Sequence, residues 1–324
     1  MPKDRVLLTM GDPNGIGPEV LLKSLSRLAP NSLSRLLIVG DRTHIEGLSQ
    51  DLNISPPPLE YLHVDAGMYP PAWGQISAHA GSVAYTCLEA AMRQLCKGQG
   101  SALVTAPIHK KAARMAGFGF AGQTEFVSSY FPSANPAMGF LSDSLKLVLA
   151  TVHVPLSEVP FLLSSDRIIT CSELLRNTLI DLGIPVPRIA LCGLNPHASD
   201  SGLFGQEEQN VITPALQTLQ SRHGIESFTG PHPSDSLFTQ KSLAKQDGIV
   251  AMYHDQGLIP FKLLAFNSGV NTTLGLPVVR TSPTHGTAFD IAGQGTADSS
   301  SMQTAIEWAI HLADIRLDGN TCSG

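Results

Sequence analysis

Short runs rich in Val, Ile and Leu recur along the chain, and amphipathic stretches with helical spacing follow them. The runs predict strands at Val6 to Thr9, Leu36 to Val39, Ala102 to Thr105, Leu145 to Val152, Ile189 to Cys192 and Ile249 to Tyr253. The amphipathic stretches predict helices at Pro18 to Leu28, Ser82 to Cys96, Cys171 to Leu182 and Ser300 to Ala313. This alternation of strand and helix is typical of an α/β fold with largely parallel sheets.

The alternation is interrupted at three places. Ile54 to Pro71 carries five prolines and little apolar periodicity, so we predict a surface loop there. Breaks near Tyr130 to Pro136 and near Leu274 to Pro277 suggest domain boundaries. They favour one domain built from both chain ends, residues 1–130 with 275–324, and a second domain inserted between them, residues 131–274.

Composition narrows the class of protein further. The chain has 324 residues, of which 43% are hydrophobic and only 15% charged, so it can bury a large core and is not disordered as a whole. Its net charge of −6 argues against nucleic-acid binding, and no apolar run is long enough to span a membrane. The N-terminus lacks a signal-peptide core, and the five cysteines form no C-x-x-C motif, so we expect a cytoplasmic protein.

Two glycine-rich segments resemble nucleotide or phosphate motifs. Gly117 to Gly122 matches G-x-G-x-x-G, but it follows a helix-like stretch and opens no predicted helix, so the dinucleotide interpretation fails its context. In TMGDPNGIGPEV a strand enters a turn before Pro18, which suits the first turn of a helix. Backbone N–H groups in such a turn could bind an anion, and a tight connection capped by Asp12 or Asn14 explains the residues equally well.

Three histidines occupy equivalent positions along the chain. His153, His197 and His254 each lie at or just beyond the end of a predicted strand. Open α/β sheets bind their ligands at the carboxyl ends of parallel strands. Three neutral imidazoles with an open position are a catalytic arrangement for a divalent metal, so we predict a shared metal site.

Polar residues gather near these histidines, although the chain has few charges. A cation near a strand end could meet a phosphate or carboxylate, whereas a solvated surface charge is the ordinary alternative for each residue alone. Glu207 and Glu208 are expected to open a helix, where acids favour the positive end of the dipole. The polar residues concerned are Thr124, Glu125, Asp255, Gln256, Lys262, Asn271 and Arg280.

Seven separated blocks together resemble one enzyme family over nearly the whole chain. They are TMGDPNGIGPE, VTAPIHK, GQTEF, CGLNPHAS with downstream GQEE, GPHPSDSLF, AMYHDQG, and GVNTTLGLPVVRTSPTHGTAFDIAGQG. In this order they resemble the 4-hydroxythreonine-4-phosphate dehydrogenases of pyridoxal phosphate biosynthesis. The resemblance implies an isocitrate/isopropylmalate dehydrogenase-like fold, with two α/β/α domains, mixed and largely parallel sheets and an active site in the interdomain cleft.

The same resemblance assigns roles to particular residues. It implies that His153, His197 and His254 bind one divalent metal, which could be zinc, cobalt or magnesium. It also implies a homodimer whose site is shared between chains, and an NAD or NADP cofactor. For catalysis the resemblance points to Lys262 and Asp255. For a small phosphorylated substrate it points to Gln123, Thr124, Lys262, Asn271 and Arg280. For the cofactor it points to His285, Gly286, Thr287, Asp290 and Gly293.

One residue departs from the family pattern. The family usually has Gly-His-Thr-Glu where this chain has Gly-Gln-Thr-Glu, so Gln123 replaces a substrate-contacting imidazole. An amide can still form hydrogen bonds, but it cannot titrate near neutral pH. The substitution bears directly on which substrate the chain accepts.

The implied reaction is the oxidation of 4-phosphohydroxy-L-threonine at its C3 hydroxyl, followed by decarboxylation to 3-amino-2-oxopropyl phosphate. Two related activities compete with it: dehydrogenation of 4-phosphorylated threonate or erythronate, and dehydrogenation of an aromatic-acid cis-dihydrodiol. From other classes, a non-redox metalloenzyme or a phosphate acyltransferase of the same fold remains open. A substrate panel and a cofactor titration would separate these alternatives.

Overall fold

The chain folds into two compact units in a computed structural model that describes residues 4–55, 57–67 and 69–321. The first unit joins the two chain ends, Met1–Ala134 and Leu276–Gly324, and the second is Asn135–Gly275. None of the helices in the described residues is long and apolar enough to cross a membrane.

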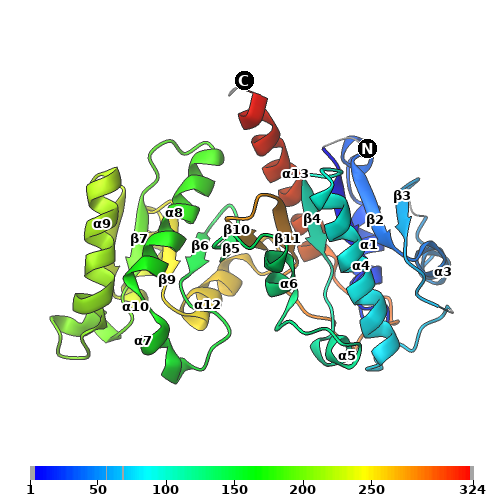
Figure 1. The fold of residues 1–324 in the computed structure, drawn as a ribbon, viewed down its shortest axis with the longest axis horizontal. Helices are drawn as coiled ribbons and strands as arrows, with labels where there is room; N and C mark the ends of the chain where they lie inside the picture. The colour runs from blue at the N-terminus through cyan, green and yellow to red at the C-terminus, as the bar shows by residue number, and fades with distance from the viewer. Residues whose placement is uncertain (1–3, 56, 68, 322–324) are drawn as a thin grey trace. The chain divides into compact units, whose positions relative to one another are not determined.

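The first unit is built on a sheet in which every strand runs parallel to its neighbours (Figure 1). The strands follow the order β3-β2-β1-β4-β11. Four of the five are almost completely buried, because apolar side chains point to both faces. The strands are β1 (Val6–Thr9), β2 (Leu36–Gly40), β3 (Glu60–His63), β4 (Ala102–Thr105) and β11 (Val279–Ser282).

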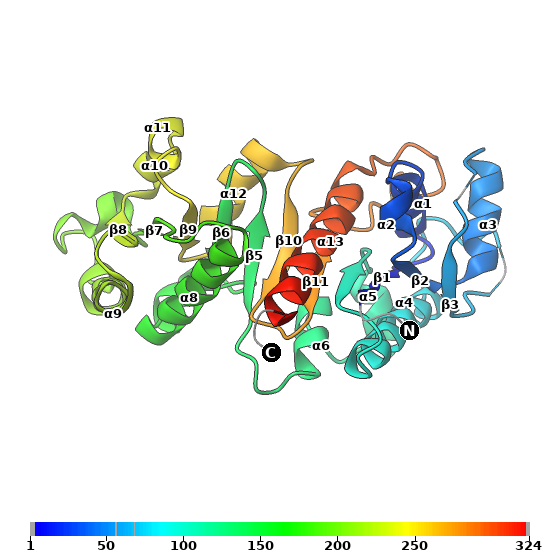
Figure 2. The same cartoon turned by 90° about the horizontal axis from the view of Figure 1, so that it is seen from above.

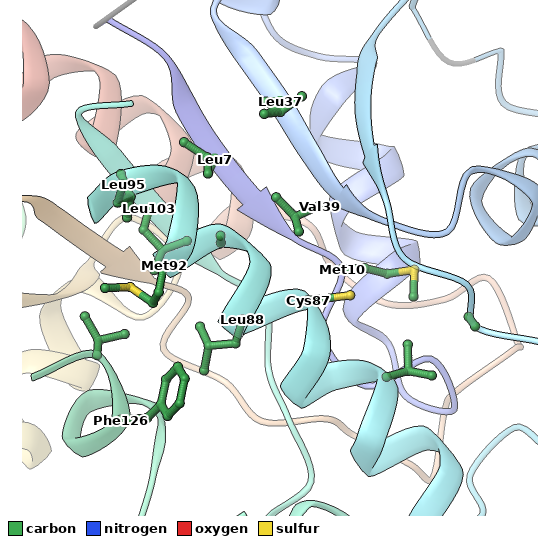
Figure 3. Close-up of a cluster of buried hydrophobic side chains, with 14 of the residues drawn as sticks. Leu7, Met10, Leu37, Val39, Cys87, Leu88, Met92, Leu95, Leu103 and Phe126 are labelled. Carbon is green, nitrogen blue, oxygen red and sulfur yellow. The ribbon is translucent and has the colours of Figure 1, made fainter. Parts of the chain in front are cut away.

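Helices cover both faces of this first sheet. On one face α4 packs against Leu7, Val39 and Leu103, and Figure 3 shows this core with Leu88 and Met92 of the helix. On the other face α1 and α13 lie against each other, and α13 also packs on β4 and β11. The helices are α1 (Gly17–Leu25), α2 (Pro30–Leu33), α3 (Arg42–Asp51), α4 (Ala78–Cys96), α5 (Lys110–Met115), α6 (Gln123–Ser129) and α13 (Ser300–Thr321).

The second unit has a mixed sheet in the order β10-β5-β6-β9-β7-β8. Its first two pairings, β10 with β5 and β5 with β6, are antiparallel, and the remaining three are parallel. The three strands β6, β9 and β7 are therefore parallel neighbours with their carboxyl ends at one edge. The strands are β5 (Ala137–Leu141), β6 (Lys146–Leu149), β7 (Ile189–Cys192), β8 (Phe228–His232), β9 (Gly248–Ala251) and β10 (Val270–Leu274).

Alternate residues of these strands face two separate cores. Val250 packs with α8 and α9, whereas its neighbours Ile249 and Ala251 pack with α12. Figure 2 shows α8 and α12 on opposite sides of β6 and β9. The helices are α7 (Val159–Leu162), α8 (Ser165–Asp181), α9 (Thr213–His223), α10 (Ser234–Leu237), α11 (Gln240–Leu243) and α12 (His254–Ala265), with a π-helical turn at Glu208–Ile212 and 3₁₀ turns at Leu156–Glu158 and Pro196–Asp200.

The structure confirms the α/β class and corrects three local predictions. The predicted loop at Ile54 to Pro71 contains the strand β3, whose residues Glu60–His63 pair with β2 at the sheet edge. Gly122 is the N-cap of α6, so the G-x-G-x-x-G match does open a helix, although α5 and not a strand precedes it. Asp12 and Asn14, the two residues expected as caps, do not cap α1. The N-cap of this helix is Ile16, which makes no side-chain cap hydrogen bond.

Candidate functional site

The three histidines predicted as metal ligands follow three neighbouring parallel strands of the second unit. His153 comes four residues after β6, His254 three residues after β9, and His197 five residues after β7. Two of them, His153 and His197, have left-handed backbone conformations, with φ of 49° and 56°. Left-handed non-glycine residues are uncommon and cluster at functional sites. The strand ends therefore hold these residues in specific, strained conformations.

His153 and His254 lie together at a cavity of about 420 Å³. Their ring centroids are 5.7 Å apart, with the ring planes at 41°. His254 is held through Nδ1, which lies 2.6 Å from Asp255 Oδ1. A carboxylate on one ring nitrogen fixes the tautomer and leaves Nε2 as the metal-binding atom, which is the usual surrounding of a histidine ligand. The pair therefore fits part of a metal site.

His197 does not join this pair within one chain. Its ring lies beside Phe204, with centroids 6.2 Å apart. Among residues 4–55, 57–67 and 69–321, no three His, Cys, Asp or Glu side chains gather closely enough to hold a metal ion. The donors present in one copy fit a divalent metal chemically, but two imidazoles leave its coordination incomplete.

His197 begins a run of five left-handed residues. Residues 197–201, which we call the left-handed turn, have φ between 46° and 68° although none of them is glycine. Each such residue costs roughly 1–2 kcal/mol relative to a right-handed conformation. Such a run persists only where the surrounding contacts hold it in place.

The other predicted residues of the second unit occupy different surroundings. Lys262 is exposed on α12, two helical turns beyond His254. Asn271 lies in β10 opposite Phe140, and its Oδ1 is buried without a hydrogen-bond partner. A buried acceptor of this kind is costly unless a ligand satisfies it.

In the first unit, Arg280 of β11 is the centre of a polar cluster. Its side chain is only 3% exposed. The guanidinium donates to Thr105 Oγ1 at 2.7 Å and to Thr124 Oγ1 at 3.4 Å. Burial lowers the pKa of Arg280 to about 10, so the group stays charged at neutral pH. A buried, fixed guanidinium is suited to a phosphate or carboxylate.

Gln123 lies in the first turn of α6, next to Thr124. Its Nε2 donates to the carbonyl of Ala106 at 3.1 Å. Its Oε1 is buried and has no hydrogen-bond partner. The amide is therefore anchored on one side and offers an unsatisfied acceptor on the other.

The predicted cofactor loop, from His285 to Gly293, packs against two other loops of the first unit. Ile16 N donates to the carbonyl of Thr287, and Gly74 lies so close to Phe289 that a Cβ there would come within 2.7 Å of the Phe289 carbonyl oxygen. Gly293 has a φ of 76° and faces the ring of Trp73. Gly286 and Asp290 are exposed on this loop.

His285 of this loop carries a buried ring nitrogen. Its Nδ1 lies 3.0 Å from the Gly286 carbonyl, and its Nε2 is buried without a partner. Burial lowers the pKa of His285, so the imidazole is neutral at pH 7. With Nδ1 as the donor, Nε2 is an acceptor that lacks a donor. A nicotinamide cofactor carries amide, amino and hydroxyl donors, so the loop fits such a group.

Two residues of this region were missed by the sequence reasoning. The ring of His109 stacks on Phe289 of the cofactor loop, with centroids 4.7 Å apart and planes at 23°. Trp73 covers Gly293. His109 follows β4 by four residues, so the strand-end rule that selected the three other histidines would also have found it. Trp73 lies in a loop without such a signal.

The anion site suggested at the start of α1 stays a prediction, although two N–H groups of this turn already have partners. The N–H groups of Gly15 and Ile16 donate to the carbonyls of Asp12 and Thr287, so neither is available to a ligand. Asp12 instead accepts from the Asn14 N–H, and burial raises the pKa of its carboxyl group. This turn connects the cofactor loop to the sheet.

The fold and the strand-end residues define the class to which the chain belongs. It has the fold of the isocitrate dehydrogenase-like proteins, as its likeness to isocitrate dehydrogenase from Methylococcus capsulatus indicates. That likeness has a TM-score of 0.50 at 14% identity and covers 96% of this chain and 87% of the other. The family described as pyridoxal phosphate biosynthetic protein PdxA matches residues 20–309, and the chain belongs to this family.

Individual relatives agree with this assignment. A 4-hydroxythreonine-4-phosphate dehydrogenase from Desulfosudis oleivorans is 40% identical over 96% of this chain and 97% of its own length. The crystal structure of an enzyme of the same name from Klebsiella pneumoniae has a TM-score of 0.83 and 38% identity, and covers 95% of this chain and 98% of that chain. A D-threonate 4-phosphate dehydrogenase from Salmonella typhimurium is 38% identical over 97% of this chain and its full length.

Proposed function

We propose that this chain oxidises the C3 hydroxyl of 4-phosphohydroxy-L-threonine with NAD or NADP, and that the resulting β-keto acid loses carbon dioxide to give 3-amino-2-oxopropyl phosphate. The near-complete match to 4-hydroxythreonine-4-phosphate dehydrogenases carries this proposal. When bound, the nicotinamide cofactor accepts the hydride from C3. The neutral His285 and the loop around it would hold that cofactor.

The metal part of the proposal assigns His153, His254 and His197 as ligands. When bound, a divalent zinc, cobalt or magnesium ion supplies a Lewis acid that lowers the pKa of the substrate hydroxyl. Asp255 orients His254 through the 2.6 Å contact with Nδ1, so its proposed part in catalysis is that of a positioning residue. Lys262 is our candidate for transferring the proton.

We further propose that the third ligand comes from a second copy of the chain. One copy brings His153 and His254 together but not His197, so two copies can complete a site that one cannot. Large apolar side chains are exposed around the pair, which supports an interface there. They are Leu156, which lines the cavity, Phe161 and Leu162 of α7, Ile259 and Leu263 of α12, and Phe266 at the C-cap of α12.

The substrate's charged end is assigned to the buried cluster of the first unit. Arg280 offers a fixed positive charge, and Thr124 offers a hydroxyl next to it. Gln123 and Asn271 each present a buried acceptor that a substrate hydroxyl or ammonium group would satisfy. Fixed groups of this kind hold a substrate in a reactive orientation without losing flexibility on binding.

The first experiment is NADH or NADPH formation from 4-phosphohydroxy-L-threonine, before and after treatment with a chelator. Turnover should stop on chelation and return when zinc, cobalt or magnesium is added back. Chelation without any effect would exclude the metal part of the proposal. Folded, NAD-binding protein that gives no reduced cofactor would exclude the substrate.

D-threonate 4-phosphate is the second candidate substrate, because a relative acting on it is nearly as similar as the first one. The two substrates differ at C2, where one carries an ammonium and the other a hydroxyl group. Both can donate to the Gln123 amide, so that contact alone does not separate them. The values of kcat/KM measured side by side for the two compounds decide which is preferred.

A further inference from the structure

The peptide groups that lead into the left-handed turn are held by buried side chains. Glu208 is 2% exposed, and its Oε1 accepts from the N–H groups of Leu194 and Asn195 at 2.8 and 2.7 Å. Its Oε2 accepts from Asn195 Nδ2 at 2.9 Å. All three bonds involve a carboxylate, which forms stronger hydrogen bonds than a neutral acceptor. One side chain therefore fixes two consecutive residues immediately before the turn.

A second buried residue holds the same segment from the other side. Gln256 Nε2 donates to the carbonyl of Gly193 at 2.6 Å, and its Oε1 accepts from Met252 N at 2.6 Å. Because Gln256 lies two residues after His254, it connects the start of α12 to the segment that leads to His197. The end of β7 and the end of β9 are thus joined through side-chain hydrogen bonds.

The turn also packs closely against the strand end that precedes it. A Cβ at Gly193 would lie 2.9 Å from Ala198 Cα and 3.2 Å from Glu208 Oε1, so only glycine allows this approach. Ser199 is buried, and its Oγ and its carbonyl accept from Gly202 N and Phe204 N. The left-handed residues are therefore determined by their contacts and not by their own preferences.

We propose that Glu208 is a positioning residue, which holds the left-handed turn so that His197 can serve as a metal ligand. The sequence alone suggested a different role, that of an acid at a helix start. Glu208 does begin the π-helical turn, but its carboxylate is used on the segment 194–195 instead. A buried carboxylate and five left-handed residues each cost free energy. The carboxylate bonds Asn195, two residues before His197, where the left-handed turn begins.

The inference rests on the proposed metal function, so the test measures the metal alone. Co²⁺ is titrated into the full-length protein, and its visible absorption reports both the affinity and the coordination geometry of the ion. Glu208→Gln keeps the shape of the side chain but replaces an accepting oxygen with a donor, so it should weaken Co²⁺ binding about 10- to 100-fold. At saturation its spectrum should resemble that of His197→Ala rather than that of the unmodified protein.

Glu207→Gln is the matched control. Glu207 is the adjacent acid, and within the described part of the chain its carboxylate accepts from the Asn195 side chain alone, at 2.7 Å, so Co²⁺ affinity should not change. Gly193→Ala adds a methyl group against Ala198 of the turn without removing a polar group, and it should weaken Co²⁺ binding as Glu208→Gln does. This second variant keeps the test decisive if Glu208→Gln does not fold.

The outcomes separate the two proposals. If His197→Ala loses Co²⁺ affinity while Glu208→Gln and Gly193→Ala bind normally with an unchanged spectrum, Glu208 does not position His197 and only this inference is overturned. If His197→Ala itself binds Co²⁺ normally, the metal assignment fails and the positioning role falls with it. Hydrogen exchange of residues 194–204 should rise in Glu208→Gln relative to Glu207→Gln, and equal exchange would also overturn the inference.

Discussion

Arg280 carries a charge at a buried position, and the planar geometry of its guanidinium lets it bond two threonines there. Lysine would keep the charge but lose the planar fork that reaches both Thr105 and Thr124. Hydrogen bonds to charged groups contribute about 1.5–3 kcal/mol. For Arg280→Lys we therefore expect kcat/KM for the phosphorylated substrate to fall roughly 10- to 100-fold.

Steady-state kinetics with 4-phosphohydroxy-L-threonine measure this effect. Arg114→Lys is the matched control, because Arg114 is exposed on α5 and its substitution should leave kcat/KM unchanged. Thermal unfolding of both variants shows whether the fold is retained. Equal kinetics in a folded Arg280→Lys protein would remove Arg280 from substrate binding.

A second prediction at the residue scale concerns Gln123 and the dependence of the reaction on pH. Its amide cannot titrate, so this position contributes no ionisation to the profile of kcat/KM against pH. Gln123→His introduces an imidazole whose ordinary pKa lies near 6.5. The variant should show an added inflection between about pH 6 and 7, measured with the same substrate. Superimposable profiles would show that position 123 does not contact the substrate.

At the scale of elements, the cofactor loop depends on a conformation that only glycine adopts easily. Gly293 has a φ of 76°, and a Cβ there would lie 2.6 Å from Trp73 Cδ1. Gly293→Ala should lower the free energy of unfolding by roughly 1–2 kcal/mol and weaken NADH binding, because the loop must shift away from Trp73. Chemical denaturation and a fluorescence titration with NADH measure the two effects.

Gly119→Ala provides the comparison for that experiment. Gly119 has open space around its Cα and no positive φ, so the added methyl group should be tolerated. If both alanine variants unfold alike and bind NADH alike, the contact between Trp73 and the loop has no role in holding the cofactor site.

The elements also show what the sequence could predict and what it could not. Buried strands that are continuous apolar runs, such as Val6–Thr9 and Ile189–Cys192, were predicted. The buried strands β5, β10 and β11 were not predicted. The edge strand β3 was missed, since its residues are half-exposed and prolines surround it. The helix α12 was missed because it begins directly after a strand and contains Pro260. The strain of the left-handed turn arises from tertiary contacts, which no local pattern records.

For the site, the sequence predicted which residues to consider but not how they are arranged. Strand-end position and family resemblance both selected His153, His197 and His254. Neither shows that two of them lie together in one copy while the third stays apart. That separation depends on the path of the chain after each strand. It is the observation behind our proposal that a second copy supplies the third ligand.

At the scale of the whole molecule, we predict that association and metal binding are lost together. Leu263 is 82% exposed on α12, on the same helix as His254, and a charge there would be buried unpaired in an interface between two copies. Leu263→Glu should therefore shift the protein from dimer to monomer in sedimentation experiments at micromolar concentration. It should also lower Co²⁺ affinity, because the third histidine would no longer be supplied.

Ile225→Glu separates this effect from a general response to a surface charge. Ile225 is 70% exposed in the segment between α9 and β8, which carries none of the proposed interface residues, so the variant should remain a dimer and bind Co²⁺ normally. A monomeric Leu263→Glu protein that still binds Co²⁺ with full affinity would show that one chain gathers the metal ligands by itself. A dimer that survives Leu263→Glu would place the interface on another face.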